Sequence, residues 1–122
     1  MKNGEVLQLY ETLCRISDNK ELTFGVRVGY TMVKNKAKLK DEAQLIHNMR
    51  HKIIVEAGIK NDNDELIIPK SKIDETNRKI NELMEMDSSI EVEKIDINSL
   101  KLNLNIEDIE GLLPMLYEKT PE

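Results

Sequence analysis

The sequence predicts a mainly α-helical fold of the α+β class: one long central helix flanked by two shorter helices, with a small β element and a short C-terminal helix. The first observation is a charged stretch without proline from Phe24 to Ala57, which ends at Gly58. As a helix, its roughly 33 residues span about 50 Å. The second observation is that only 3% of residues are aromatic, so the core is aliphatic. A chain of 122 residues cannot bury such a rod on all sides, and we expect one domain over residues 1–122, organised by the rod.

The first predicted element is a helix over residues 4–16. Its apolar residues recur at three- and four-residue spacing and define one face, and Asn3 is placed to cap its start. These apolar residues are Val6, Leu7, Leu9, Tyr10, Leu13 and Ile16. A polar turn follows over residues 17–20.

Residues 22–30 fit two interpretations. Apolar residues alternate with Thr, Gly and Arg from Leu22 to Met32, which is typical of a strand. The same segment also carries a helical stripe (Val26, Tyr30, Val33 and Ala37), and Thr23 suits a helix N-cap. Gly25 and Gly29 would each cost a helix about 1 kcal/mol relative to Ala. The residues alone leave helix and strand open here. With the helix interpretation, the predicted long helix spans residues 24–57.

From Thr31 to Ala57 the pattern predicts helix throughout. A second apolar stripe runs along Leu39, Ala43, Ile46, Met49 or Arg50, Ile53 and Ala57. At about 100° per residue, Val33 and Ile53 lie about 200° apart around the axis. The two halves of the rod are therefore predicted to bury opposite faces, with the first and third helices on opposite sides. Gly58 is predicted to be a left-handed residue that ends the helix.

The rest of the chain is predicted to contain shorter elements. Residues 58–69 form a turn or small hairpin, and Ser71 with Asp74 resembles a capping box for a helix over residues 71–86. Residues 89–97 alternate as a strand, with a bulge between Val92 and Ile95. Asn105 has cap spacing for a last short helix over residues 105–118, interrupted or ended near Pro114.

Charge is unevenly distributed along a chain whose net charge is −5. Residues 24–53 carry seven basic side chains and two acidic ones, whereas residues 86–122 carry nine acids and three lysines. The simplest interpretation is that the acidic end neutralises the basic rod or that both are solvated; the alternative is a basic patch for an acidic partner. The candidate partner-binding residues are Arg27, Lys34, Lys38, Glu91, Glu93 and Asp96.

No motif in the sequence indicates catalysis or metal binding. His47 and His51 have the spacing of a helical zinc pair, but Arg50 lies between them and no third histidine exists. Residues 61–65 resemble a calcium loop without its glycine and its final glutamate. Cys14 cannot form an intrachain disulfide and lies beside an apolar helix face. We therefore expect no enzyme, no catalytic residue, no metal, no cofactor and no small-molecule ligand.

The sequence also indicates the expected compartment and excludes some partners. The first residues lack the apolar run of a signal peptide, and no segment approaches the roughly 20 apolar residues of a membrane span. We expect a soluble protein, made in the cytoplasm, without a membrane partner. Its acidic net charge argues against general nucleic-acid binding, although the basic rod keeps that option as a weaker hypothesis.

Four short motifs follow one another in an order that we recognise. They are residues 2–7 (KNGEVL), 30–35 (YTMVKN), 56–62 (EAGIKND) and 112–116 (LLPML). Together they resemble a family of small proteins of unknown function from tailed phages and prophages of Gram-positive bacteria. The chain departs from that pattern at Gly25 and Gly29, where we expect helix-compatible residues. The resemblance implies a phage setting and favours helix over residues 22–30, and it brings no activity or cofactor.

Two functional hypotheses follow from these observations. The leading one is a non-enzymatic phage protein that acts through protein–protein contacts, as a virion or assembly accessory made in the host cytoplasm and incorporated in the virion. Its partner would be a second copy, or a phage or host protein. The alternative is an inhibitor of a host defence or regulatory protein. In that case the acids of the C-terminal third, Glu91, Glu93, Asp96, Glu107, Asp108 and Glu110, would mimic the charge of nucleic acid.

Overall fold

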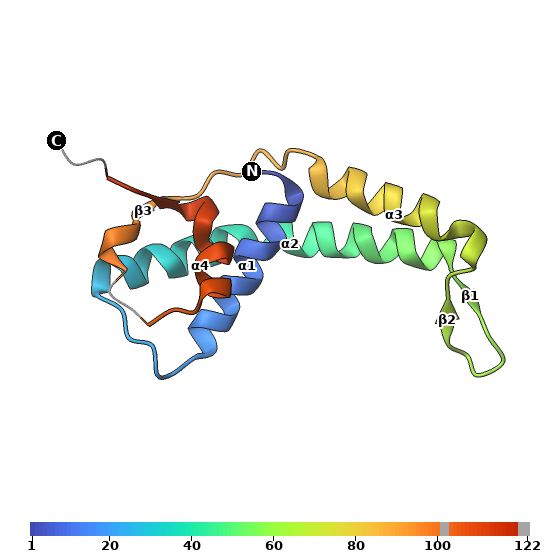
Figure 1. Ribbon diagram of the computed structural model, residues 1–122, viewed down its shortest axis with the longest axis horizontal. Helices are drawn as coiled ribbons and strands as arrows, with labels where there is room; N and C mark the ends of the chain where they lie inside the picture. The colour runs from blue at the N-terminus through green and yellow to red at the C-terminus, as the bar shows by residue number, and fades with distance from the viewer. Residues whose placement is uncertain (101–102, 120–122) are drawn as a thin grey trace.

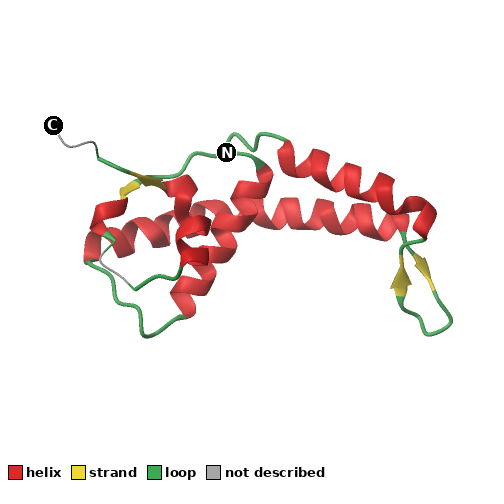
Figure 2. Ribbon diagram, viewed as in Figure 1, coloured by secondary structure: helices red, strands yellow, loops and turns green. Residues whose placement is uncertain are grey.

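The computed structural model describes residues 1–100 and 103–119 and confirms a mainly α-helical fold with small strands (Figure 2). Its α-helices are α1 (Asn3–Asp18), α2 (Val26–Ala57), α3 (Lys70–Glu85) and α4 (Ile106–Leu112). Its strands are β1 (Ile59–Lys60), β2 (Leu66–Ile67), β3 (Ile95–Asp96) and β4 (Leu116–Tyr117). Two short 3₁₀ turns, η1 (Ile97–Ser99) and η2 (Leu113–Met115), complete the described elements.

The long helix α2 divides the molecule into two regions (Figure 1). We call the first region the body: it contains residues 1–46 and the C-terminal segments 86–100 and 103–119, with α1 crossing α2 and α4 lying over α1. The second region, the arm, contains residues 47–85: the second half of α2, the β1–β2 hairpin, and α3, which runs back along α2. The hairpin projects from the far tip of the arm.

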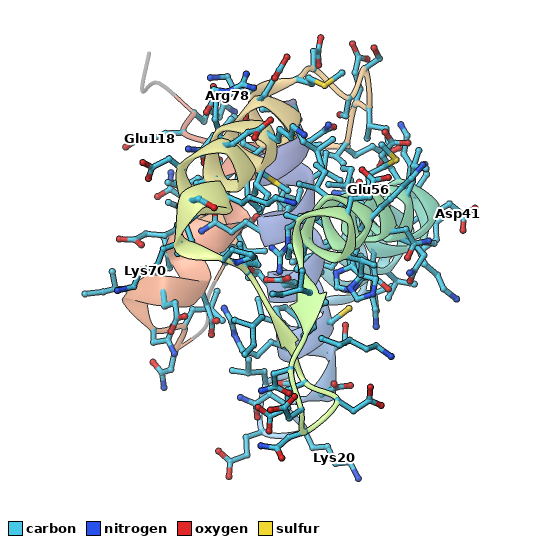
Figure 3. All side chains as sticks on the ribbon, turned by 90° about the vertical axis from the view of Figure 1, so that its right-hand side faces the viewer. Lys20, Asp41, Glu56, Lys70, Arg78 and Glu118 are labelled. Atoms are coloured by element: carbon cyan, nitrogen blue, oxygen red, sulfur yellow. The ribbon has the colours of Figure 1, made fainter. Side chains whose placement is uncertain are left out.

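The body has three layers, with α1 between α2 and α4 (Figure 3). Apolar side chains from all three helices form the core beneath this crossing, as the spacing in residues 4–16 predicts. The core residues are Val6, Leu9, Leu13, Ile16, Met32, Leu39, Ala43, Ile46, Ile95, Leu112 and Met115. The helix α4 reaches α1 closely at Gly111, where a Cβ atom would lie only 2.0 Å from Thr12 Oγ1.

The segment over residues 22–30 is helical from Val26 onward, so the strand interpretation is wrong. The helix starts two residues later than predicted, and Gly25 rather than Thr23 is its N-cap. The first turn closes normally, since the Gly29 amide donates to the Gly25 carbonyl at 2.9 Å. Neither glycine is needed for a close backbone approach, because a Cβ atom at either position would meet nothing nearer than 3.6 Å.

The prediction that α2 buries opposite faces in its two halves is wrong. One stripe continues through the body, because Met32 and Asn35 are buried in register with Leu39, while Val33 is exposed. The helices α1 and α3 touch each other and therefore do not lie on opposite sides of α2. The polar residue Asn35 interrupts the apolar pattern in the sequence, so the pattern alone predicts a stripe that begins only at Leu39.

Asn35 is buried because a distant segment satisfies its side-chain amide. Its Nδ2 donates to the Glu93 carbonyl at 2.8 Å, and its Oδ1 accepts the Glu93 amide at 3.0 Å. The Asn35 side chain therefore satisfies the Glu93 amide and carbonyl, which a neighbouring strand would otherwise bind. The predicted strand over residues 89–97 is therefore reduced to β3, which pairs in parallel with β4 at Ile95–Leu116 and Asp96–Tyr117.

Three residues predicted to cap or end helices have a different role in the structure. Asn3 is not a cap but a buried residue inside α1, whose Nδ2 donates to the Leu83 carbonyl at 2.8 Å. No capping box forms at Ser71, because α3 already starts at Lys70, after Pro69. Gly58 has a φ of −85°, which is not left-handed. A Cβ atom there would lie 2.5 Å from Leu66 Cδ1 across the hairpin, so a larger residue at position 58 requires the exposed Leu66 side chain to move.

Two other local predictions are confirmed. The antiparallel pairing of β1 with β2 forms the predicted hairpin at the tip of α2. Asn105 caps α4, since its Oδ1 accepts the Asp108 amide at 2.8 Å. Pro114 lies in η2, so the predicted last helix over residues 105–118 ends at Leu112 and the chain continues into β4.

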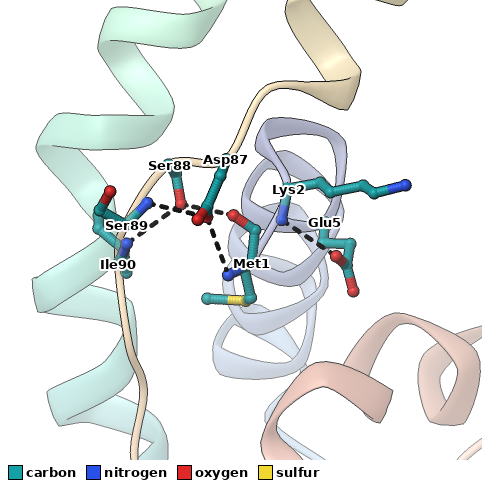
Figure 4. Close-up of polar contacts among 7 residues, drawn as sticks. All are labelled: Met1, Lys2, Glu5, Asp87, Ser88, Ser89 and Ile90. Atoms are coloured by element: carbon teal, nitrogen blue, oxygen red, sulfur yellow. Dashed lines mark hydrogen bonds and ion pairs between the residues drawn. The ribbon is translucent and has the colours of Figure 1, made fainter.

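The start of α1 is attached to the segment that follows α3 (Figure 4). The Ser88 amide donates to the Met1 carbonyl at 2.9 Å, and the N-terminal ammonium lies 3.5 Å from Asp87 Oδ1. The Ser89 amide, which donates to Asp87 at 3.1 Å, and then the positive N-terminus lower the pKa of the Asp87 carboxyl below its usual value. This junction joins the exit of the arm to the body.

Candidate protein-binding surface

An exposed apolar stripe runs along the first half of α2, on the side that faces away from α1. Val26 is 92% exposed, Tyr30 65% and Val33 63%, and Ala37 is exposed as well. At about 100° per residue these positions lie within about 60° of one another, and about 150° from the buried stripe. We call these four residues the α2 stripe. Exposed apolar residues that gather on one face are typical of a binding site, whereas scattered ones are normal.

Basic side chains lie on both sides of the α2 stripe. Three of them are the predicted contact residues Arg27, Lys34 and Lys38 on one flank, and Lys36 and Lys40 lie on the other. Arg27 and Lys38 are exposed. The segment of α2 from Val26 to Lys40 contains no acidic residue. The surface is therefore an apolar strip with a positive border.

Lys34 forms the one contact within the set of predicted partner-binding residues. Its ammonium pairs with the Glu93 carboxylate and lies 5.9 Å from the centroid of the Tyr30 ring. The hydrogen bond to Glu93, together with the charge of that carboxylate, raises the pKa of Lys34, so the side chain is charged at neutral pH. The pair supports the interpretation that acidic residues neutralise part of the basic rod.

A shallow apolar pocket of about 220 Å³ adjoins the α2 stripe and shares Val33 with it. Its other apolar walls are Ile16, Leu22, Phe24 and Met32. A cavity of about 150 Å³ in another protein holds a benzene molecule. The pocket therefore has room for one apolar side chain of a partner that lies on the stripe.

The predicted acidic contact residues are partly occupied within the chain. Glu91 is exposed, Glu93 pairs with Lys34, and Asp96 accepts the Asn98 amide at 3.0 Å at the start of η1. Asp108 is buried against α1, where Arg15 donates to its Oδ1 from Nε at 2.9 Å and from Nη2 at 2.8 Å. Several of these acids thus stabilise the body and are not free to form a continuous anionic face.

A second apolar patch, which the sequence analysis missed, lies on the outer side of α4. Ile106 is 76% exposed and Leu113, the first residue of η2, is 54% exposed, whereas Leu112 is fully buried. Glu107 and Glu110 are exposed on the same helix. We call these four residues the α4 face. The sequence shows four apolar residues over residues 106–113, but Ile106 and Leu113 are indistinguishable from core residues until the position of α1 is known.

The arm carries a third, smaller apolar patch at its tip. Ile59 and Ile67 are directly opposite each other in the hairpin and are both exposed. The patch consists of this cross-strand pair and the neighbouring Leu66, because each strand is two residues long. The tip is thus a narrow contact point.

The two histidines and the cysteine lie outside these three patches. His47 and His51 are exposed on α2, and no group of three or more His, Cys, Asp or Glu side chains in the described residues is arranged to hold a metal ion. Cys14 is half-buried beside Tyr10. A hydrogen bond with Cys14, followed by burial, raises the pKa of the Tyr10 phenol, which is therefore protonated at neutral pH and is no base for the thiol. Among the described helices, none combines the length and apolar character of a membrane span.

Comparisons with known proteins identify no relative: no family model, no curated protein and no solved structure matches this chain.

Proposed function

We propose that this is a non-enzymatic protein that acts through protein–protein contacts at the α2 stripe, as a virion or assembly accessory of a phage. The observation that carries the proposal is the exposure of Val26, Tyr30 and Val33 on one face of a well-packed helix. The phage setting comes from the resemblance of the four short motifs. The proposal places the protein in the host cytoplasm when it is made, and in the particle when assembly is complete.

An apolar helix face that stays in water lacks the free energy that its burial would provide. Burial of apolar surface stabilises by roughly 25 cal/mol per Å², so a partner that covers the α2 stripe gains that free energy. The helix beneath the stripe is held rigidly by the buried Met32 and Leu39 on its other side. A partner therefore binds a preformed surface and loses little free energy to ordering it.

The alternative, an inhibitor that mimics nucleic acid, has weaker support. Such a mimic presents its carboxylates together on one solvated face, whereas Asp108 is buried and paired with Arg15, and Glu93 pairs with Lys34. The apolar α2 stripe also has no role in charge mimicry. A nucleic-acid partner for the basic rod is disfavoured for the same reason, because phosphate binding does not select an exposed Val–Tyr–Val face.

The experiment that tests the proposal is site-specific photocrosslinking in the bacterium that encodes the protein. A photoreactive phenylalanine analogue replaces Tyr30 in one full-length variant and Arg78, exposed on α3, in a matched control variant. We expect protein adducts from position 30 and none from position 78. Mass spectrometry of the adducts is expected to identify a phage structural protein or a second copy of the chain, and purified particles are expected to contain the protein.

Two results would contradict the proposal. Equal adducts from both positions, or none from either, would show that the α2 stripe is not a binding surface. Adducts with a host nuclease or polymerase alone, together with particles that lack the protein, would support the inhibitor instead.

A further inference from the structure

We infer that the chain associates with itself head to tail, with the α2 stripe of one copy against the α4 face of the next. This inference rests on the proposed function and names the partner at the same surface. It requires that the two surfaces are complementary, that they can be occupied at the same time, and that neither surface pairs with itself. The structure bears on each of these conditions.

The two surfaces lie on opposite sides of the body. The helix α1 separates α2 from α4 (Figure 3), and each outer helix buries its inner side against α1. The exposed Val33 and Ile106 therefore belong to two helices on different sides of α1. One copy can contact two neighbours at once, which a head-to-tail arrangement requires.

The surfaces are complementary in character. The α2 stripe is apolar with a border of Arg27, Lys36, Lys38 and Lys40, beside Lys34, which is paired with Glu93; the α4 face is apolar with Glu107 and Glu110. Contact between them buries apolar side chains on both partners and brings opposite charges together at the rim. Complementary rim charges of this kind select the partner and its orientation.

Pairing of like surfaces is disfavoured by the same charges. A symmetric dimer through the α2 stripe would bring lysines and Arg27 of one copy against the same residues of the other. A symmetric dimer through the α4 face would oppose Glu107 and Glu110 with themselves. Like charges at an interface act against the wrong partner, so unlike surfaces meet.

The size of the surfaces sets the expected strength. From Val26 to Ala37 the stripe is about 17 Å long, and from Ile106 to Leu113 the α4 face is about 10 Å long. Contacts of this extent belong to the small interfaces, which are weak and transient. We therefore expect association that increases with protein concentration and decreases with added salt, because salt screens the rim charges.

The test uses three full-length variants of unchanged net charge. The stripe variant is Tyr30→Gln/Val33→Gln, and the α4 variant is Ile106→Gln/Leu113→Gln. The matched control is Ile59→Gln/Ile67→Gln, which removes a similar apolar pair from the tip of the arm. All six positions are exposed, so the variants keep the fold; circular dichroism checks this. Sedimentation velocity measures the average mass of each protein over a range of concentrations.

The wild type and the arm control are expected to increase in average mass with concentration. The stripe variant and the α4 variant are each expected to stay monomeric over the same range. An equimolar mixture of these two variants is expected to form a one-to-one pair and nothing larger, because each supplies the surface that the other lacks. Only a heterologous interface gives this complementation.

The inference would be overturned by a monomeric wild type, by association that survives in either patch variant, or by a mixture that remains monomeric. Loss of association in the arm control would instead place the interface at the hairpin. A monomeric wild type together with position-30 adducts to another phage protein would overturn self-association while the proposed function stands.

Discussion

The body and the arm share one helix but differ in what holds them together. In the body, α2 is covered by α1 and by the segment around Glu93, and Leu39 is fully buried. In the arm, α2 packs mainly against α3, and Thr76 is the one buried residue among residues 47–85. A gap of about 100 Å³ lies beside Thr76, between Ile53 and Lys79. The arm is thus a two-helix extension on a packed body.

This difference shows that continuity of a helix does not imply uniform stability. The helix α2 is continuous through both regions, but most helical stability in proteins comes from burial of an apolar face. The arm relies on half-buried contacts and on exposed i,i+4 ion pairs such as Glu75–Lys79 and Arg78–Glu82. We expect the arm to open locally while the body stays folded.

The largest effect is expected from comparing the truncation of a buried residue in the body with that of a half-buried residue in the arm, both on the same stripe of α2. Leu39→Ala removes a fully buried side chain and is expected to lower the free energy of unfolding by about 3–5 kcal/mol. Ile53→Ala, two heptads further along α2 at a half-buried position, is expected to cost about 1 kcal/mol. Urea unfolding measures both values, and amide exchange is expected to be faster in α3 than in α1. Equal losses would mean that the arm is packed like the body.

The second effect concerns the polar contact that covers α2 in the body. Asn35→Ala removes both bonds to Glu93 and leaves that residue's amide and carbonyl without a partner. We expect a loss of about 1–3 kcal/mol in the free energy of unfolding, because these two bonds are partly shielded from water and the buried Asn35 site loses its polar side chain. Lys34→Ala, which removes the exposed ion pair with Glu93 and the contact with the Tyr30 ring, is the control and is expected to leave the free energy of unfolding nearly unchanged. A loss of similar size in the control would assign the stabilisation to the charge pair.

The third effect tests the close contact of α4 with α1. Gly111→Ala places a methyl group against Thr12 and is expected to cost about 1–3 kcal/mol, because α4 has to move outward. Gly29→Ala is the matched control: its Cβ meets only Phe24 Cβ at 3.6 Å, and the alanine favours helix by up to about 1 kcal/mol. Thermal unfolding measures both. An unchanged melting temperature for Gly111→Ala would show that the α1–α4 contact adapts.

The smallest effect is expected at the junction of arm and body. The pKa of Asp87 is lowered in the folded state, so folding favours its charged form. Its contribution to stability is therefore complete above the ordinary pKa of aspartate and is lost as pH falls through the lower folded value. Asp87→Asn is expected to be slightly less stable than the wild type at pH 7 and to lose less stability below pH 4. Melting temperatures at both pH values test this, and parallel acid profiles would contradict it.

Local patterns in the sequence were sufficient for most elements. The spacing of Leu9, Leu13 and Ile16 defines α1, the absence of proline after Thr31 allows a long α2, and Asn105 marks the start of α4. These features act within one or two turns of the chain, so they have the same meaning in any fold. The fold class follows from them because helix periodicity and caps are local properties.

The tertiary structure decided which apolar residues of α2 are buried and which form the candidate binding surface. Met32 and Val33 are adjacent in the chain, and both are apolar. Only the position of α1 determines that Met32 is buried and Val33 is exposed. Asn35 is polar by itself, yet it belongs to the core because the Glu93 backbone meets its amide from far along the chain. Burial depends on the partner that a residue meets, and that partner is set by packing over long sequence distances.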